Sequence, residues 1–157
     1  MHNKGLRVIL VILLAIPMLK IFNIPGSISS LIHLKNAVPE AFPIQLLFNV
    51  IGIMFTLLAV VSFVCGLLSV IKVKTNKPLL VVAILAIGIV AAYNIFGITN
   101  YIINMINQSK EVFNVMLKNA IRAIIENICA VAAIAVGVLL IIKEGKIYEE
   151  KRVEELC

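Results

Sequence analysis

The feature that most constrains this chain is an uncharged, apolar run of 28 residues from Ile44 to Ile71, which reads IQLLFNVIGIMFTLLAVVSFVCGLLSVI. As an α-helix the run would be roughly 42 Å long, which exceeds the thickness of about 30 Å of a bilayer's hydrocarbon core. It has no polar stripe that could face water, whereas helices of soluble proteins are usually amphipathic. The run therefore predicts a helix that crosses a membrane.

The composition of the whole chain favours the same class of protein. Hydrophobic residues make up 62% of the sequence, above the roughly 45–50% that is usual in soluble domains. The net charge of +6 comes from basic residues at the ends of apolar runs, where they would anchor the chain beside lipid headgroups. We therefore expect the lipid bilayer as a partner and no nucleic acid.

Enzyme signatures are missing from the sequence. All eight acidic residues are Glu, which disfavours metal and hydrolytic centres built on aspartate. The HExxH, GxSxG, P-loop and GxGxxG patterns do not occur in a sensible context. Cys65, Cys129 and Cys157 form no CxxC pair, so we expect no disulfide. The sequence thus predicts a non-enzymatic protein with no catalytic residue, metal or cofactor.

Three further apolar segments complete a predicted all-α integral membrane protein, a four-transmembrane-helix antiparallel bundle that forms one membrane domain over residues 1–157. The predicted spans are about 6–24, 44–71, 79–103 and 120–142, with an outer loop at 25–43 and a helical cytoplasmic tail at 143–157. The first apolar run also fits a signal peptide, but no A-x-A-like site follows and the run continues past Lys20, so we expect an uncleaved span. Pro17 should kink it, because proline lacks a backbone donor.

The outer loop and the start of the fourth span each contain a further helical pattern. Within the outer loop, apolar residues recur at helical spacing between 27 and 38, which predicts a short helix in the membrane interface. The charge-free part of the fourth span, 127–142, covers only roughly 24 Å, so that span should begin near Ala120. A polar row at four-residue spacing precedes it and predicts that this helix starts outside the membrane, near Lys110.

The distribution of basic residues predicts the orientation. Segments 1–7, 72–77 and 143–152 carry nine Lys and Arg residues, whereas the opposite side carries five. The positive-inside rule then places both termini and the 72–78 turn in the cytoplasm, and we expect the cell membrane as the location.

Three polar residues within the predicted spans fall at one depth. Counted from the cytoplasmic ends of their helices, Lys20, Asn94 and Glu126 lie 14, 15 and 16 residues along, respectively. These lengths are roughly 21–24 Å, in the outer leaflet. Ionisable groups at such a depth usually turn inward, so these residues and nearby Arg122 form a candidate intramembrane polar site for an ion or proton. In the simpler interpretation Lys20 and Glu126 reach the interface, or Glu126 pairs with Arg122.

Small and hydroxyl-bearing residues form the remaining pattern. The residues expected at helix-packing contacts are Gly52, Gly66, Gly88, Ala92, Cys129, Ala133 and Gly137. Those expected to form interhelical hydrogen bonds are Asn49, Thr56, Ser62 and Ser69. Small-residue faces without a site motif predict an accessory subunit or scaffold that associates with another membrane protein or with copies of itself. The alternative is a small oligomeric transporter or pore that uses the polar level as its site.

Overall fold

The computed structural model describes residues 3–37, 39–40, 42–71, 77–105 and 110–154. Its regular structure over these ranges is helical: α1 Asn3–Met18, the 3₁₀ helix η1 Leu19–Asn23, α2 Ile24–Ala37, α3 Phe42–Ile71, α4 Lys77–Met105 and α5 Lys110–Glu154. Four stretches are long and apolar enough to cross a membrane, namely Lys4–His33, Phe42–Ile71, Lys77–Asn100 and Phe113–Gly145. The prediction of an all-helical chain with four potential spans is confirmed.

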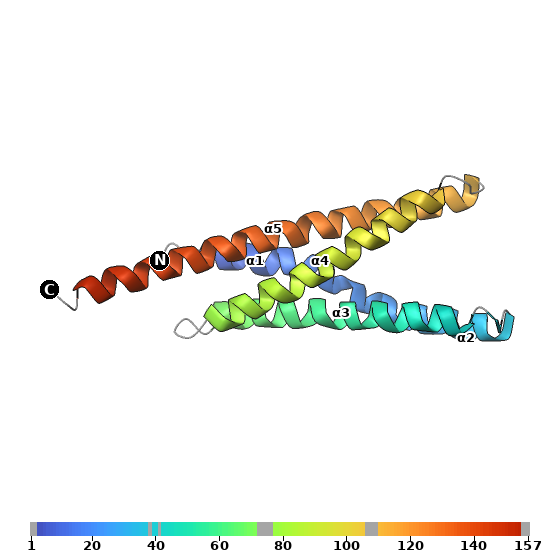
Figure 1. Cartoon of the computed structure of the whole chain (residues 1–157), viewed down its shortest axis with the longest axis horizontal. Helices are drawn as coiled ribbons and strands as arrows, with labels where there is room; N and C mark the ends of the chain where they lie inside the picture. The colour runs from blue at the N-terminus through green and yellow to red at the C-terminus, as the bar shows by residue number, and fades with distance from the viewer. Residues whose placement is uncertain (1–2, 38, 41, 72–76, 106–109, 155–157) are drawn as a thin grey trace.

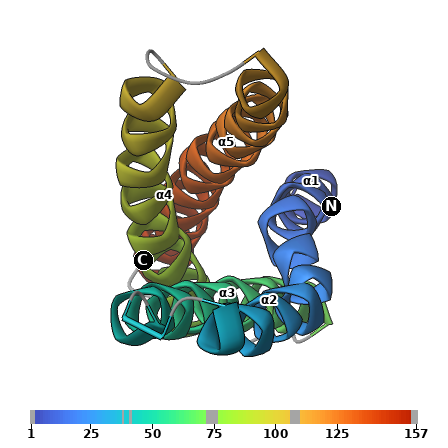
Figure 2. The ribbon, with the colours of Figure 1, turned by 90° about the vertical axis from the view of Figure 1, so that its right-hand side faces the viewer.

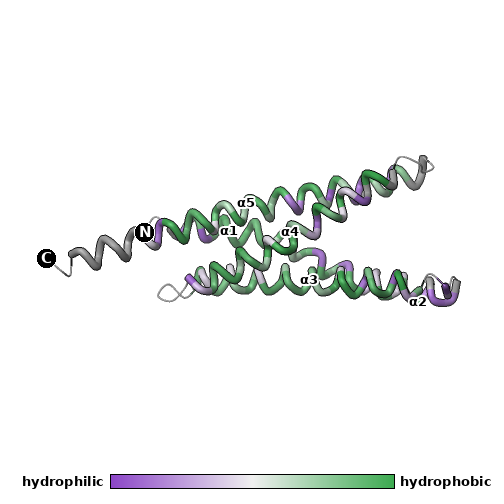
Figure 3. The backbone as a smooth tube through the Cα atoms, viewed as in Figure 1, coloured by the Kyte–Doolittle hydropathy of each residue, from purple (hydrophilic) through white to green (hydrophobic). Residues whose placement is uncertain are grey.

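The four long helices form a ring in which α1 packs on α3 and α5, and α4 packs on the same two helices. We call the end where α1 begins and α3 ends the proximal end, and the end where α2 and α4 finish the distal end (Figure 1). Toward the distal end α4 and α5 lean away from α1, α2 and α3, so that the bundle is splayed there (Figure 2). Most of the length that the helices share is apolar (Figure 3).

The buried core occupies the proximal and middle parts of the bundle. It is built from residues of all four long helices: Leu10, Leu14, Ala59, Leu80, Ala83, Ile87, Val90, Ala91, Ala130, Ala133 and Leu140. In lipid, helices associate through close van der Waals packing rather than through the hydrophobic effect, because lipid tails are as apolar as leucine. The many alanines in this core permit that close approach.

The first helix continues beyond its predicted end. The helix predicted within the outer loop 25–43, between 27 and 38, is present as α2 and is longer than predicted, over Ile24–Ala37. The helix tightens to 3₁₀ geometry at η1, where the Ile24 N–H donates to the Ile21 carbonyl three residues back. Pro25 has no N–H with which to form the α-helical bond to that carbonyl, which explains the tighter turn. α2 then runs along α3 (Figures 1 and 2), so it does not lie across the end of the bundle as the predicted interfacial helix would.

The last helix is much longer than the others. α5 starts at Lys110, where the polar row predicts its start, and it continues through the charged tail to Glu154. The side chains of 146–154 and all of 155–157, including Cys157, lie outside the described residues. The same is true of most of the predicted basic turn, since 72–76 are not described.

Candidate functional site

The structure brings the side chains of the predicted polar level into contact. Lys20 Nζ lies 2.7 Å from Glu126 Oε2 and donates a hydrogen bond of 2.7 Å to Asn94 Oδ1. Arg122 Nε donates to Glu126 Oε1 at 3.0 Å, one helical turn away on the same helix. Both the inward-facing cluster and the simpler Arg122–Glu126 pair of the sequence interpretation are therefore present at once.

Three elements, η1, α4 and α5, position the members of this cluster. Lys20 lies on η1, whose 3₁₀ winding begins two residues after Pro17. Asn94 lies on the inner face of α4, and Glu126 lies on the α5 face that also buries Ala133 and Gly137. That small-residue face brings α5 close to its neighbours, so the Glu126 carboxylate points into the bundle.

The cluster combines buried and exposed groups. Asn94 and Glu126 are only 4% and 3% exposed, whereas the side chains of Lys20 and Arg122 are 28% and 51% exposed. A buried carboxylate needs charge partners and hydrogen bonds, and here two cations supply them. The contact to Oε2 is an ion pair without hydrogen-bond alignment, because Oε2 has no hydrogen-bond partner within the described chain.

Some hydrogen-bonding groups of the cluster, and one on Asn127, the residue that follows Glu126 in the chain, have no partner among the described residues. Asn94 Nδ2 and Asn127 Oδ1 are buried without a hydrogen-bond partner in the part of the chain that the structure describes. Only Nε of the Arg122 guanidinium is paired there, so its terminal nitrogens keep their hydrogen-bonding capacity. Unpaired buried polar groups are uncommon in native proteins, which makes this level of the bundle a place where a polar ligand could be bound.

A polar cleft of about 390 Å³ extends from the cluster toward the distal end, where the helices splay apart. Its walls come from η1, α2, α3, α4 and α5, and its lining comprises Lys20, Asn23, Ile24, Ser27, Gln45, Phe48, Asn49, Gly52, Ile53, Thr56, Tyr93, Asn94, Gly97, Asn119, Arg122, Ala123 and Glu126. The cleft contains two cationic side chains and one carboxylate. Its net charge is positive, so it favours an anionic group over a cation.

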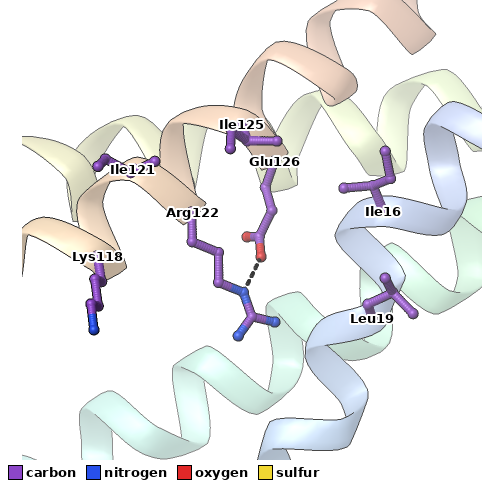
Figure 4. Close-up of a pocket in the computed structure, with 7 residues that line it drawn as sticks. All are labelled: Ile16, Leu19, Lys118, Ile121, Arg122, Ile125 and Glu126. Atoms are coloured by element: carbon purple, nitrogen blue, oxygen red, sulfur yellow. Dashed lines mark hydrogen bonds and ion pairs between the residues drawn. The ribbon is translucent and has the colours of Figure 1, made fainter. Parts of the chain in front are cut away.

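A second, apolar groove of about 310 Å³ opens sideways between α1 and α5. Figure 4 shows Ile16 and Leu19 on one side, with Ile121 and Ile125 on α5 opposite them. Lys118, Arg122 and Glu126 complete the lining. Arg122 and Glu126 also line the polar cleft, so the ion cluster borders both hollows.

The residues predicted at packing contacts differ in how closely a neighbouring helix approaches them. A Cβ atom added at Gly66 would lie 2.6 Å from Leu14 Cδ1, and one added at Gly137 would lie 2.6 Å from Ile84 Cδ1. At Gly52 and Gly88 the nearest atoms would be 3.9 Å away, an ordinary contact. Ala133 is fully buried, and Cys129 is partly buried with a free thiol.

Ala92 does not pack within the bundle. It is exposed on α4, because the buried face of that helix passes through Ile87, Val90, Ala91 and Asn94 instead. Of the Gly88–Ala92 pair, Gly88 faces Ile134 of α5, whereas Ala92 faces away from the bundle.

The hydroxyl and amide residues predicted to link helices mostly bond within their own helix. Ser62 donates to a neighbouring helix, at 2.7 Å to the Ala83 carbonyl, and Ser69 donates to the Gly66 carbonyl of its own helix. Asn49 and Thr56 donate to carbonyls one turn earlier, those of Gln45 and Gly52. Side chains of this kind satisfy themselves on the preceding turn when no partner helix is close enough.

The proximal end holds a second ion pair that sequence reasoning missed. Arg7 on α1 is 7% exposed, pairs with Glu144 on α5 and donates to the Ser69 carbonyl on α3. From the sequence, Arg7 is expected only as a basic residue at the end of a span. The available signal was its position at the same predicted depth as Glu144, since opposite charges at one level of adjacent helices attract.

Tyr93 is one of several residues lining the polar cleft that the sequence does not single out. Its ring stacks on Phe55 with centroids 3.9 Å apart, and its side chain borders the polar cleft. Its place next to Asn94 in an otherwise apolar run was the available signal.

Comparison of the chain with protein-family models, curated proteins and solved structures gives no match, so the site is interpreted from its own geometry. Over the described residues, no three His, Cys, Asp or Glu side chains lie together as they would in a metal centre.

Proposed function

We propose that this chain is an integral membrane protein whose four helices cross the cell membrane with the proximal end in the cytoplasm, and that it binds a ligand bearing an anionic group in the polar cleft. This corresponds to the transporter alternative of the sequence analysis, with the site inside one bundle. The observation that carries the proposal is the ion cluster of Lys20, Asn94, Arg122 and Glu126 at the inner end of the cleft.

The chemistry of the cluster supports an anionic ligand. Ionisable side chains within a membrane-spanning region are costly, and they commonly mark substrate or ion pathways. Glu126 neutralises only one of the two cations beside it, and the terminal nitrogens of Arg122 are available as donors toward the cleft. Guanidinium binds carboxylate and phosphate oxygens through two parallel hydrogen bonds, which fits a ligand of that charge.

The position of the core favours a binding site over a continuous pore. Leu10, Leu14 and Ile87 are at most 1% exposed and fill the bundle between the ion cluster and the proximal end. Beyond them, Arg7 joins α1, α3 and α5. A ligand in the cleft would therefore have access from the distal side in this conformation, as in an outward-facing transporter.

The test measures the electrostatic preference of the cleft on the purified full chain. Asn49, which lines the cleft, is replaced by cysteine in a chain carrying Cys65→Ala, Cys129→Ala and Cys157→Ser. Two methanethiosulfonate reagents of similar size are compared, one bearing a sulfonate and one a trimethylammonium group, each normalised to its rate with a small free thiol. We expect the anionic reagent to react about tenfold faster, because a charged cleft concentrates the opposite charge.

Arg122→Gln should reduce this preference, whereas Lys143→Gln, an exposed cation at the proximal end, should leave it unchanged. Equal rates for both reagents, or a faster cationic reagent, would contradict an anion-favouring cleft. If Lys143→Gln lowers the preference for the anionic reagent as much as Arg122→Gln does, the preference comes from the overall net charge of the protein. The proposed site would then be wrong.

A second candidate function is the accessory subunit or scaffold, and the exposure of Ala92 favours it. Ala92 is a small, exposed residue of α4, beside which a helix of another membrane protein could approach closely. Purification in mild detergent distinguishes the candidates. If this function is the right one, a different chain co-purifies stoichiometrically and is lost on Ala92→Leu but not on Ala135→Leu, an exposed alanine of α5.

A further inference from the structure

The lateral groove and the polar cleft share Arg122 and Glu126 in their linings and otherwise differ in the character of their walls. At the sideways opening between α1 and α5, the walls are the aliphatic side chains of Ile16, Leu19, Ile121 and Ile125. At the inner end, the groove reaches Arg122 and Glu126, which also belong to the cleft. A molecule lying in the groove would therefore have an apolar part between α1 and α5 and a polar part at the ion cluster.

Three cationic side chains lie at or next to the residues that line both the groove and the cleft. Lys118 is exposed at the groove and has no hydrogen-bond or ion-pair partner among the described residues. Lys118 and Arg122 stand one turn apart on α5, and their side chains extend to the same side of the helix (Figure 4). With Lys20 they give three cations against the single carboxylate of Glu126, so an anionic group is preferred there.

The aliphatic lining is exposed rather than covered by the protein. Leu19, Ile121 and Ile125 are 47%, 49% and 52% exposed, respectively. In the proposed orientation this opening lies in the outer leaflet and faces the acyl chains of the bilayer. A groove whose apolar mouth faces lipid and whose inner end carries unpaired guanidinium donors matches an amphiphile with an anionic head.

We infer that the ligand of the cleft is an anionic phospholipid that enters from the outer leaflet through the α1–α5 opening, with its phosphate on Lys118 and Arg122 and an acyl chain in the groove. The inference rests on the proposed function and adds the ligand class and the route. Ile121 and Ile125 then determine whether an acyl chain fits the groove, and the cations select lipids with an anionic headgroup.

The experiment measures binding to the full-length protein in a neutral detergent, by native mass spectrometry and by ligand-induced shifts of thermal unfolding. The probes are phosphatidylglycerol, phosphatidylcholine with the same chains, and glycerol 3-phosphate as the head without a chain. We expect phosphatidylglycerol to bind at least about tenfold more tightly than either other probe. It alone combines acyl chains with a net negative headgroup, whereas the choline cation of phosphatidylcholine is repelled by the cations of the site and glycerol 3-phosphate has no acyl chain.

Two α5 variants separate the groove from general lipid contact. Ile125→Trp fills the groove, whereas Ile128→Trp places the same bulk at a position 62% exposed that does not line it. Ile125→Trp should weaken phosphatidylglycerol binding about tenfold and Ile128→Trp should not. If Ile125→Trp lowers thermal stability in the absence of lipid, Ile121→Trp replaces it. Arg122→Gln should bring phosphatidylglycerol down to the affinity of phosphatidylcholine.

The outcomes are distinguishable from those of the proposed function. If glycerol 3-phosphate binds as tightly as phosphatidylglycerol and the tryptophan variants have no effect, the ligand is a soluble phosphate and the lipid inference is wrong, while the proposed anionic site stands. Equal weakening by Ile125→Trp and Ile128→Trp would show non-specific annular lipid and would also overturn the inference. If no probe binds and the two thiol reagents react equally at Asn49→Cys, the proposed function fails as well.

Discussion

At the scale of single residues, the account depends on how Glu126 is held. Its carboxylate is buried between Lys20 from η1 and Arg122 from its own helix. Breaking a buried ion pair by removing one partner is strongly destabilising, because it leaves the other charge without compensation. Arg122 is half exposed and can turn to solvent, whereas Lys20 is mostly covered, so the Lys20–Glu126 contact carries the larger coupling.

This coupling gives the first prediction. Glu126→Gln should lower the free energy of unfolding in detergent by about 2–3 kcal/mol, and Lys20→Met alone by a similar amount, because each leaves a partly desolvated charge. The double variant should be less destabilised than the sum of the two by about 1 kcal/mol or more. Chemical-denaturant unfolding followed by circular dichroism measures all three. Strict additivity would mean that the two side chains do not interact in the folded protein.

The sequence predicts the common depth of the cluster residues but not all of their contacts. Helix periodicity and the rise of 1.5 Å per residue place Lys20, Asn94 and Glu126 at one depth, and the small-residue row turns Glu126 inward. The direction of Lys20 could not be derived in the same way, because it depends on the 3₁₀ geometry of η1. Arg7 and Glu144 were missed because basic residues at span ends are usually interpreted as lipid anchors.

At the scale of elements, helix continuity and helix contact decide the shape of the bundle. The charge-free runs are sufficient to predict the long helices, because an apolar segment in lipid must satisfy its backbone internally. Pro25-Gly26 led to the prediction of a loop, yet proline is tolerated in the first turn of a helix, where α2 places it. Proline therefore marks a change of helix geometry here and not the end of the helix.

The close approach of α5 to α4 gives the second prediction. A methyl group at Gly137 would meet Ile84 at 2.6 Å, whereas one at Gly145 on the same helix would meet no atom within 4 Å. Gly137→Ala should therefore destabilise the protein by about 1–3 kcal/mol through overpacking. Gly145→Ala should be neutral or stabilise it by up to about 1 kcal/mol, since alanine is the better helix former.

The measurement is the midpoint of thermal unfolding of both variants in the same detergent. A destabilisation by Gly145→Ala equal to that of Gly137→Ala would contradict the packing of α5 described above, because the two glycines differ only in what surrounds them. The sequence separates them in part, because Gly137 belongs to the predicted small-residue face whereas Gly145 lies among charged residues beyond the predicted span. The contact with Ile84 could not be predicted, because it depends on how α4 packs against α5.

At the scale of the whole molecule, the two ends of the bundle are built differently. At the proximal end, Arg7 of α1 donates to the Ser69 carbonyl of α3 and pairs with Glu144 of α5. The buried core lies between these contacts and the polar cleft. The distal end is splayed and contains the polar cleft. This asymmetry, together with the excess of basic residues at the proximal side, supports a bundle that presents its cleft to the outside of the cell.

The most direct test of this account is the sidedness of two single cysteines in intact cells, using a membrane-impermeant maleimide and the cysteine-free background with Asn49→Cys or Lys143→Cys. The account predicts that the cysteine at 49 reacts in intact cells, and that the cysteine at 143 reacts only after the membrane is permeabilised. Reaction of the cysteine at 143 from outside, with the one at 49 protected until permeabilisation, would reverse the orientation. Equal labelling of both in intact cells would contradict a bundle that crosses the membrane with its cleft on one side.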